Sequence, residues 1–198
     1  MRKLLVVTVA LAIQGCAHRT MVITGPGEAN RYDVDAVLKA NPVGPEEAVK
    51  PVRLGADERA SFSLVQIRTR EKPHLHAAHD LFVNLVRGEG SLLMVKRVSS
   101  TVFLCSLVPM RAGDSSFIAR GTTHCFINRA GAPSVAFATY TPPFDGTDVV
   151  PSLSREVEEA ERWLNERQLS LQRMDAWIML KEGGTSVEWG VKTEGESR

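Results

Sequence analysis

Two short stretches, PHLHAAHD at residues 73–80 and GDSSFIARGTTHCFIN at residues 113–128, decide the fold that we predict for this chain. Together they hold four of its five histidines. Around them lie short runs rich in β-branched and apolar residues, which are typical of strands in an antiparallel sandwich or barrel. The predicted strands cover residues 61–69, 81–86, 91–95, 101–108, 124–128 and 134–140.

The histidines are spaced as metal ligands would be. His74 and His76 are two residues apart, so on a β-strand both side chains point to the same face. His124 lies on a later predicted strand, and closure of the strands into a barrel would bring the three imidazoles together. Three imidazoles bind a divalent transition metal and leave coordination positions open for a substrate or dioxygen.

The second stretch carries a family resemblance. Gly113, Ala119, Gly121, His124 and Asn128 stand at the spacings of the second cupin motif, with alanine where that family usually has proline. The resemblance extends over roughly residues 61–140. It implies a mainly β fold, a cupin-like antiparallel jelly-roll β-barrel.

The first stretch resembles the first cupin motif less completely. His74 and His76 are followed by Asp80 and Gly88, but the usual metal-binding glutamate is absent. Counted back from Gly88 its position is Leu81, and counted forward from His76 it is Asp80. The two counts differ by one residue, which reverses the face to which a strand side chain points.

Three interpretations of the site therefore remain open. The ligands are His74, His76, His124 and Asp80, or the three histidines alone, as the resemblance to three-histidine cupin oxygenases implies, or the metal site is vestigial. We expect the three histidines as the metal core, with Asp80 as a fourth ligand or as a residue that orients an imidazole. The metal would be Fe, Mn, Zn or Ni. The alternative is a barrel mouth with polar histidines and no metal.

Several other residues have a structural and a functional interpretation. His79 is expected in an exposed loop, with a role as acid or base as the alternative. Phe82 and Phe126 are expected to pack in the core, although they and Asn84 share strand faces with the predicted ligands. Asn128 would bind a ligand or fix a turn.

Two further pairs of residues have open roles. Asp145 and Asp148 are expected to form a turn and a helix cap rather than a calcium site. Cys105 and Cys125 are either a disulfide or two separate buried thiols.

The first fifteen residues are typical of a secretory signal peptide, with basic Arg2 and Lys3 before an apolar run over residues 4–13. Cys16 after a small residue resembles the lipobox of bacterial lipoproteins, with Gln14 as a departure. The resemblance implies cleavage before Cys16, a lipid anchor on it, and residues 16–30 as a tether. Because Ala17 is not aspartate, it implies an outer-membrane lipoprotein of the bacterial cell envelope, facing the periplasm.

The remaining chain divides into a barrel and a C-terminal extension. Residues 31–150 would form the barrel together with N-terminal helical turns that begin near Asp33 and Pro45. Residues 151–198 would form a helix and a tail, because apolar residues recur at helical spacing from Val157 to Ile178 and Gly183-Gly184 follows. This helix would pack on its own domain or form the seam of a homodimer.

Composition restricts the functions further. The 198 residues carry 24 basic and 23 acidic side chains, so no basic face for nucleic acid is expected. We expect an envelope-anchored protein that binds a transition metal, a small polar ligand or both. The alternatives are a metal-dependent oxygenase- or isomerase-like enzyme and a non-catalytic protein that dimerises through its C-terminal helix. The missing glutamate favours binding over catalysis.

Overall fold

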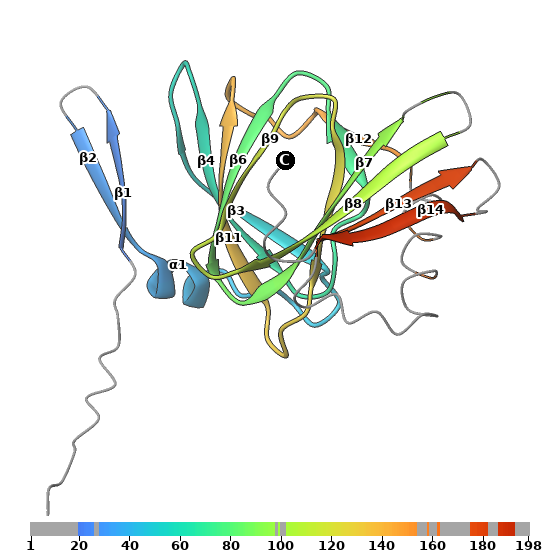
Figure 1. Ribbon diagram of the computed structural model, residues 1–198. Helices are drawn as coiled ribbons and strands as arrows, with labels where there is room; N and C mark the ends of the chain where they lie inside the picture. The colour runs from blue at the N-terminus through green and yellow to red at the C-terminus, as the bar shows by residue number, and fades with distance from the viewer. Residues whose placement is uncertain are drawn as a thin grey trace, which may run out of the picture. The chain divides into compact units, whose positions relative to one another are not determined.

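The structure, a computed structural model, describes residues 20–25, 28–97, 99, 102–153, 158, 162, 175–181 and 186–192 (Figure 1). The chain divides into two compact units, Met1–Pro42 and Val43–Arg198. In the first unit, β1 (Thr20–Gly25) and β2 (Glu28–Asp33) form an antiparallel hairpin, which α1 (Val34–Ala40) follows directly. The described part of the predicted tether is therefore a hairpin, in which β-branched Val22 and Ile23 pair with Arg31 and Asn30.

The predicted helical turns differ in outcome. Asp33 caps α1 as expected, because its carboxylate accepts hydrogen bonds from the backbone N–H groups of Asp35 and Ala36, at 2.9 and 3.2 Å. The helix predicted to begin at Pro45 is wrong. There the Glu47 carboxylate accepts a 2.6 Å bond from the Gly44 N–H and closes a single turn, after which β3 begins.

The second unit is built from two antiparallel sheets. One has the strand order β3-β4-β11-β6-β9 and the other the order β12-β5-β10-β7-β8-β13-β14. The chain passes repeatedly between the sheets, which is the antiparallel cupin-like jelly roll that the sequence predicts. The strands are β3 (Val49–Ala56), β4 (Ser61–Ile67), β5 (His74–His76), β6 (Asp80–Arg87), β7 (Glu89–Arg97), β8 (Val102–Arg111), β9 (Ser115–Ile118), β10 (Thr123–Asn128), β11 (Ser134–Thr141), β12 (Val149–Pro151), β13 (Asp175–Lys181) and β14 (Ser186–Lys192).

The core of this unit lies between the two sheets. Val65 and Leu85 come from one sheet, and Leu92, Met110 and Phe126 come from the other; all are at least 93% buried and belong to one cluster. Alternation along each strand turns these residues inward. Each such buried side chain contributes about 1.5–3 kcal/mol, so the shared core holds the histidine-bearing strands in place.

Gly88, the closing glycine of the first motif, has a structural role. It lies between β6 and β7 with φ +87°, a conformation that other residues rarely adopt. A Cβ atom at this position would stand 2.3 Å from Ser134 Oγ. The turn that joins β6 to β7 therefore requires glycine.

The C-terminal extension is only partly helical. Glu158 and Arg162 are helical, and the remaining predicted helix up to residue 174 lies outside the described residues. The extension of that helix to Ile178 is wrong, because Ile178 lies on β13 and pairs with Cys105 on β8. The predicted tail contains a strand, β14, which pairs with β13. Within the described residues, no helix has the length and apolar character needed to cross a membrane.

Candidate metal centre

Strand pairing places the candidate ligands. β5 is a short strand between β10 and β12, and His74 stands directly opposite His124 on β10. On the other side of β5, His76 stands opposite Val149 on β12. The N–H of Gly121 donates a 2.7 Å hydrogen bond to the carbonyl of His76. The turn before His124 is thereby tied to the strand that carries the other two histidines.

The structure brings the three imidazoles together. Ring centroids are 4.5 Å apart for His74 and His124, 5.1 Å for His74 and His76, and 5.7 Å for His76 and His124. One ring nitrogen from each residue lies within 4.8 Å of the other two. Nitrogens bound to the same ion at about 2.0–2.1 Å lie no more than about 4.2 Å apart, so an ion would draw nitrogens that stand at the 4.8 Å limit slightly closer together.

Two of the rings are already oriented for ligation. Nδ1 of His74 lies 2.8 Å from the carbonyl oxygen of Lys72, and Nδ1 of His124 lies 2.9 Å from that of Thr122. A carbonyl only accepts, so Nδ1 carries the proton in both rings. Nε2 is then left with its lone pair, which is the tautomer that a metal-binding histidine needs.

His76 is the third ring and has an unusual environment. It is 3% exposed, and neither ring nitrogen makes a hydrogen bond to any described residue. The backbone of Asp148 lies near enough to raise its pKa slightly, but without hydrogen-bond geometry. Burial, followed by the charges of His74 and His124, lowers the pKa of His76 to about 4. The ring is therefore neutral at pH 7, and a metal ion would supply the partner that a buried nitrogen requires.

His124 is also held in its neutral form. It is 2% exposed, and burial is the largest cause that lowers its pKa below the ordinary 6.5. The negative charge of Glu71 opposes this shift, whereas the charge of His74 adds to it. A neutral imidazole is the form that ligates a metal.

Asp80 is not brought to the three imidazoles. Its Oδ1 accepts a 2.9 Å hydrogen bond from the backbone N–H of Arg120, and its Oδ2 lies 2.7 Å from Nη2 of that arginine. The hydrogen bonds from Arg120 lower the pKa of Asp80. The next residue, Leu81, points into the core with 5% of its surface exposed. Of the interpretations that include a metal, the geometry favours the three histidines alone.

His79 corrects a further expectation, because it is 7% exposed rather than a surface-loop residue. Its Nδ1 lies 2.6 Å from Oδ2 of Asp148, and its Nε2 lies 3.3 Å from the carbonyl oxygen of Pro143. His76, His79 and Asp148 also lie close enough to hold a metal. Both nitrogens of His79 already face oxygen acceptors, so we regard the first group of three histidines as the better metal site.

Asp148 fixes the turn that follows β5. Besides contacting His79, its carboxylate accepts hydrogen bonds from the N–H groups of Ala77 and Ala78, at 3.1 and 2.8 Å. The bond from Ala78, followed by the bond from His79, lowers the pKa of Asp148 to about 2. The expectation of a helix cap is therefore wrong for Asp148, which caps a turn about 70 residues away in the chain.

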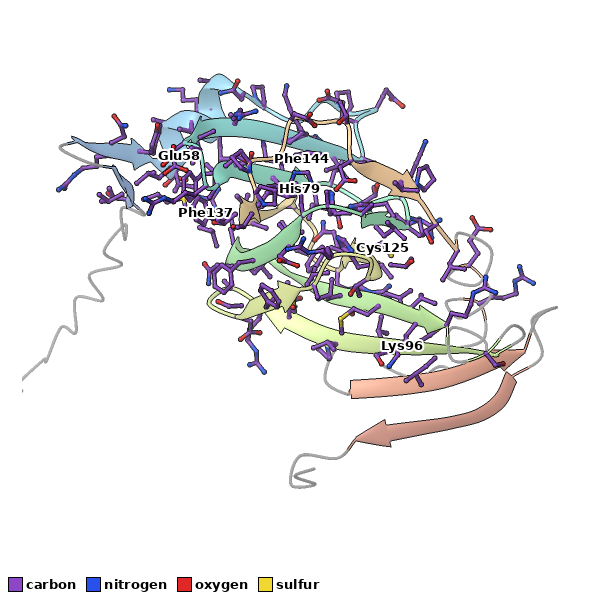
Figure 2. All side chains as sticks on the ribbon, turned by 90° about the horizontal axis from the view of Figure 1, so that it is seen from above. Glu58, His79, Lys96, Cys125, Phe137 and Phe144 are labelled. Carbon is purple, nitrogen blue, oxygen red and sulfur yellow. The ribbon has the colours of Figure 1, made fainter. Side chains whose placement is uncertain are left out.

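Aromatic rings pack around His76 and His79. The ring of Phe144 meets both imidazoles edge to face, with centroid distances of 5.3 Å to His76 and 5.4 Å to His79. Figure 2 labels Phe144 and His79. Tyr140 meets His76 in the same way at 5.3 Å and stacks on Phe144 at 4.7 Å. These contacts hold the His76 ring in position without occupying its nitrogens.

A cavity opens beside the candidate ligands. It measures about 40 Å³, enough for a few waters or a small ligand. Its polar lining consists of His74, His124, Glu71 and Tyr140, and every other lining residue is an apolar core residue such as Phe126. Neither Glu71 nor Tyr140 belongs to the histidine spacing pattern, so sequence reasoning did not identify them.

Three other candidate residues, Phe82, Asn84 and Asn128, do not line the cavity. Phe82 is 44% exposed and points away from the cavity, so the expectation of core packing is wrong for it. Asn84 donates a 2.9 Å hydrogen bond to Ser115 Oγ on the neighbouring strand. Asn128 fixes a turn, because its side chain bonds to backbone groups of Arg68, Ala130 and Ala132.

The two cysteines of the barrel are separate buried thiols. Cys105 lies on β8 and Cys125 on β10, and β7 runs between these strands. No disulfide joins the two cysteines. The structure therefore agrees with the interpretation of two buried small side chains.

Fold and site together define the class of this protein: a cupin-like jelly roll with a cluster of three histidines, of which His74 and His124 line a cavity. The chain belongs to the same family as an uncharacterized protein of Aquifex aeolicus. The two are 30% identical over 130 residues, which cover 66% of this chain and 97% of the relative. No family model matches the chain.

Several solved structures of low sequence identity are similar to part of this chain. A double-stranded β-helix protein from Klebsiella pneumoniae is 15% identical, with a TM-score of 0.46 over 63% of this chain and 100% of that one. An RmlC-like cupin from Shewanella frigidimarina is 16% identical, with a TM-score of 0.41 over 52% and 83%. An oxalate oxidase in complex with the substrate analogue glycolate is 14% identical, with a TM-score of 0.46 over 67% and 74%.

Proposed function

We propose that this protein binds one divalent transition metal ion through His74, His76 and His124. The observation that carries the proposal is His76, a buried imidazole whose two nitrogens make no hydrogen bond to the described residues. Buried polar atoms without partners are uncommon in folded proteins and call for an explanation. A metal ion shared with His74 and His124 supplies that partner.

The donor set restricts the metal. Three neutral imidazoles suit iron, zinc, nickel or copper, and manganese more weakly, because imidazole is a nitrogen ligand of intermediate softness. Nδ1 of His74 and His124 is already used by backbone carbonyls, so these rings would ligate through Nε2. A bound metal supplies Lewis acidity and open coordination positions next to the cavity.

The cavity supports a small ligand with a mainly apolar body. Its walls are core side chains, and its polar residues are His74, His124, Glu71 and Tyr140. A ligand would direct one polar group to the metal and place its apolar part among the core residues. This revises the sequence-based expectation of a small polar ligand.

Elemental analysis tests the metal proposal. The purified chain is stripped with chelator, reconstituted separately with each candidate metal at pH 7 and desalted. We expect about one equivalent of a preferred metal in the wild type, and a sharp loss in His74→Ala and His124→Ala. His18→Ala, which removes the histidine outside both clusters, is the matched control and should retain the metal. Less than about a tenth of an equivalent of every metal in the wild type would refute the proposal.

Catalysis is a second candidate function, favoured by the position of the cavity beside the three histidines. Open metal positions that face a cavity are what an oxygenase or isomerase requires. Dioxygen consumption and substrate conversion by the metal-loaded protein test this candidate against His76→Ala. If the wild type and His76→Ala convert substrate at equal rates, the reaction is due to free metal and not to the site.

We also propose that the protein is anchored in the cell envelope through a lipid on Cys16. The support is the basic start, the apolar run and the cysteine after a small residue in the sequence. The full-length chain should fractionate with membranes and the variant Cys16→Ser with the soluble fraction. A Cys16→Ser protein that stays with the membranes would contradict the anchor.

A further inference from the structure

Glu71 is a carboxylate that the sequence patterns do not mark and that the structure places at the cavity. Its N–H donates a 3.0 Å hydrogen bond to the carbonyl of Phe126, and its Oε2 accepts a 2.8 Å bond from the N–H of the same residue. Phe126 lies on β10 two residues after His124, so both side chains point to the same face. The two hydrogen bonds hold Glu71 against the strand that supplies a candidate ligand.

The charge of Glu71 reaches the cavity. Glu71 lines it together with His74 and His124 and is the only acid among its lining residues. Its negative charge raises the pKa of His124 and adds to the effect of burial in raising that of Tyr140. The negative charge of Glu71 therefore acts on two titratable residues of the cavity wall, His124 and Tyr140.

Other nearby acids cannot take this position. Asp80 is paired with Arg120, and the Asp148 carboxylate is engaged by His79 and two backbone N–H groups. Three neutral imidazoles leave a divalent ion with its full charge, which is costly next to an apolar core. A carboxylate in the same cavity lowers that cost.

We propose that Glu71 is the acidic partner of the three-histidine site: from the cavity wall it balances the charge of a bound divalent cation. This inference rests on the proposed metal binding and assigns a role to a residue outside both histidine stretches. With Glu71 in place, the combined charge of metal and cavity is lower, so the open metal positions favour neutral over anionic ligands.

Cobalt(II) titration of the purified chain, followed by absorption at pH 7, tests the inference. The amide of Glu71→Gln keeps an oxygen for the N–H of Phe126 and removes only the charge. We expect its cobalt affinity to fall at least about 10-fold, the size of effect that residues around a metal site commonly have. Asp80→Asn removes an acid outside the cavity. Its cobalt affinity should stay within about two-fold of the wild-type value, a smaller change than residues around a metal site commonly cause. An unchanged affinity in Glu71→Gln would overturn the inference.

Azide binding to the cobalt-loaded proteins separates a charge effect from a structural one. Loss of the Glu71 charge should tighten azide binding severalfold in Glu71→Gln, whereas mere distortion of the site would not. Thermal unfolding of the metal-free proteins reports whether the variant folds.

If Glu71→Gln does not fold, the isosteric pair Glu71→Asp and Glu71→Asn replaces it. Equal cobalt affinity of these two variants would also overturn the inference. A wild type that binds no cobalt refutes the proposed metal site itself, whereas equal binding by wild type and variant refutes only the role of Glu71.

Discussion

Asp80 and Leu81, neighbours on β6, point to opposite faces of their sheet. Leu81 is 5% exposed and lines the cavity, whereas the carboxylate of Asp80 pairs with Arg120. Counted through the first motif, the position of the missing glutamate falls on one or the other of these residues. The inward position is the leucine, so the only acid of this pair faces away from the histidines.

The first prediction follows from that geometry. Asp80→Asn removes a partly exposed ion pair, and such pairs contribute little to folding stability. We expect metal affinity and unfolding midpoint to remain close to those of the wild type, as measured by cobalt titration and thermal melting. A large drop in cobalt affinity, with folding intact, would show that Asp80 contributes to the site after all.

A second prediction concerns Asp148, which fixes the turn after β5. Its pKa of about 2 lies below the ordinary 3.8, so its contribution to stability is fully present above about pH 4. That contribution is lost as the pH falls through about 2. Asp148→Asn should therefore unfold at a lower temperature than wild type at pH 7, and this difference should shrink between about pH 4 and 2.

Asp145→Asn is the control for this experiment. Asp145 bonds locally to Thr147, and these bonds are the main cause that lowers its pKa, with the charge of His79 as a smaller one. Its substitution should leave metal binding unchanged, whereas loss of Asp148 weakens it by loosening His76. If the two variants were identical in cobalt affinity and melting temperature, Asp148 would have no special role.

A third prediction uses the pKa of His76, which is about 4 in the folded protein against an ordinary 6.5. Between these values the unfolded chain binds a proton that the folded chain does not, so stability is lost as the pH falls from 6.5 toward 4. In chelator, the free energy of unfolding should fall from pH 7 to pH 5 by on the order of 2 kcal/mol more in wild type than in His76→Phe. Equal pH dependence, measured by urea unfolding, would place His76 in a solvated environment.

Much of the barrel was predictable because the six predicted strands each carry their own signal, whereas β3, β9 and β12 were not predicted. The runs around Leu64, Leu92, Cys105 and Ala136, with turn residues between them, each predict one strand, and all of these strands are present. The three histidines were predictable as a group because their spacing needs only the pairing of β5 with β10. These strands and the histidine group could therefore be predicted from patterns within short stretches of the sequence.

The remaining features depend on long-range placement. The contact of His79 with Asp148 joins positions 69 residues apart, and that of Glu71 with Phe126 joins positions 55 apart, so no local pattern reports them. The sequence also left open whether Asp80 or Leu81 points to the histidines, because the two counts through the first motif differ by one residue. The predicted helix around Ile178 failed because apolar residues at helical spacing also suit a strand when a partner such as β8 is available.

The central claim is that His74, His76 and His124 hold one metal ion, and cobalt(II) titration of the metal-free protein at pH 7 tests it most directly. We predict saturation at one equivalent with the visible absorption of cobalt bound to nitrogen ligands. We also predict that His76→Ala loses this absorption while keeping its fold, because the buried ring contributes a ligand and not only packing. A wild type that binds no cobalt, or a folded His76→Ala that binds it equally well, would contradict the claim.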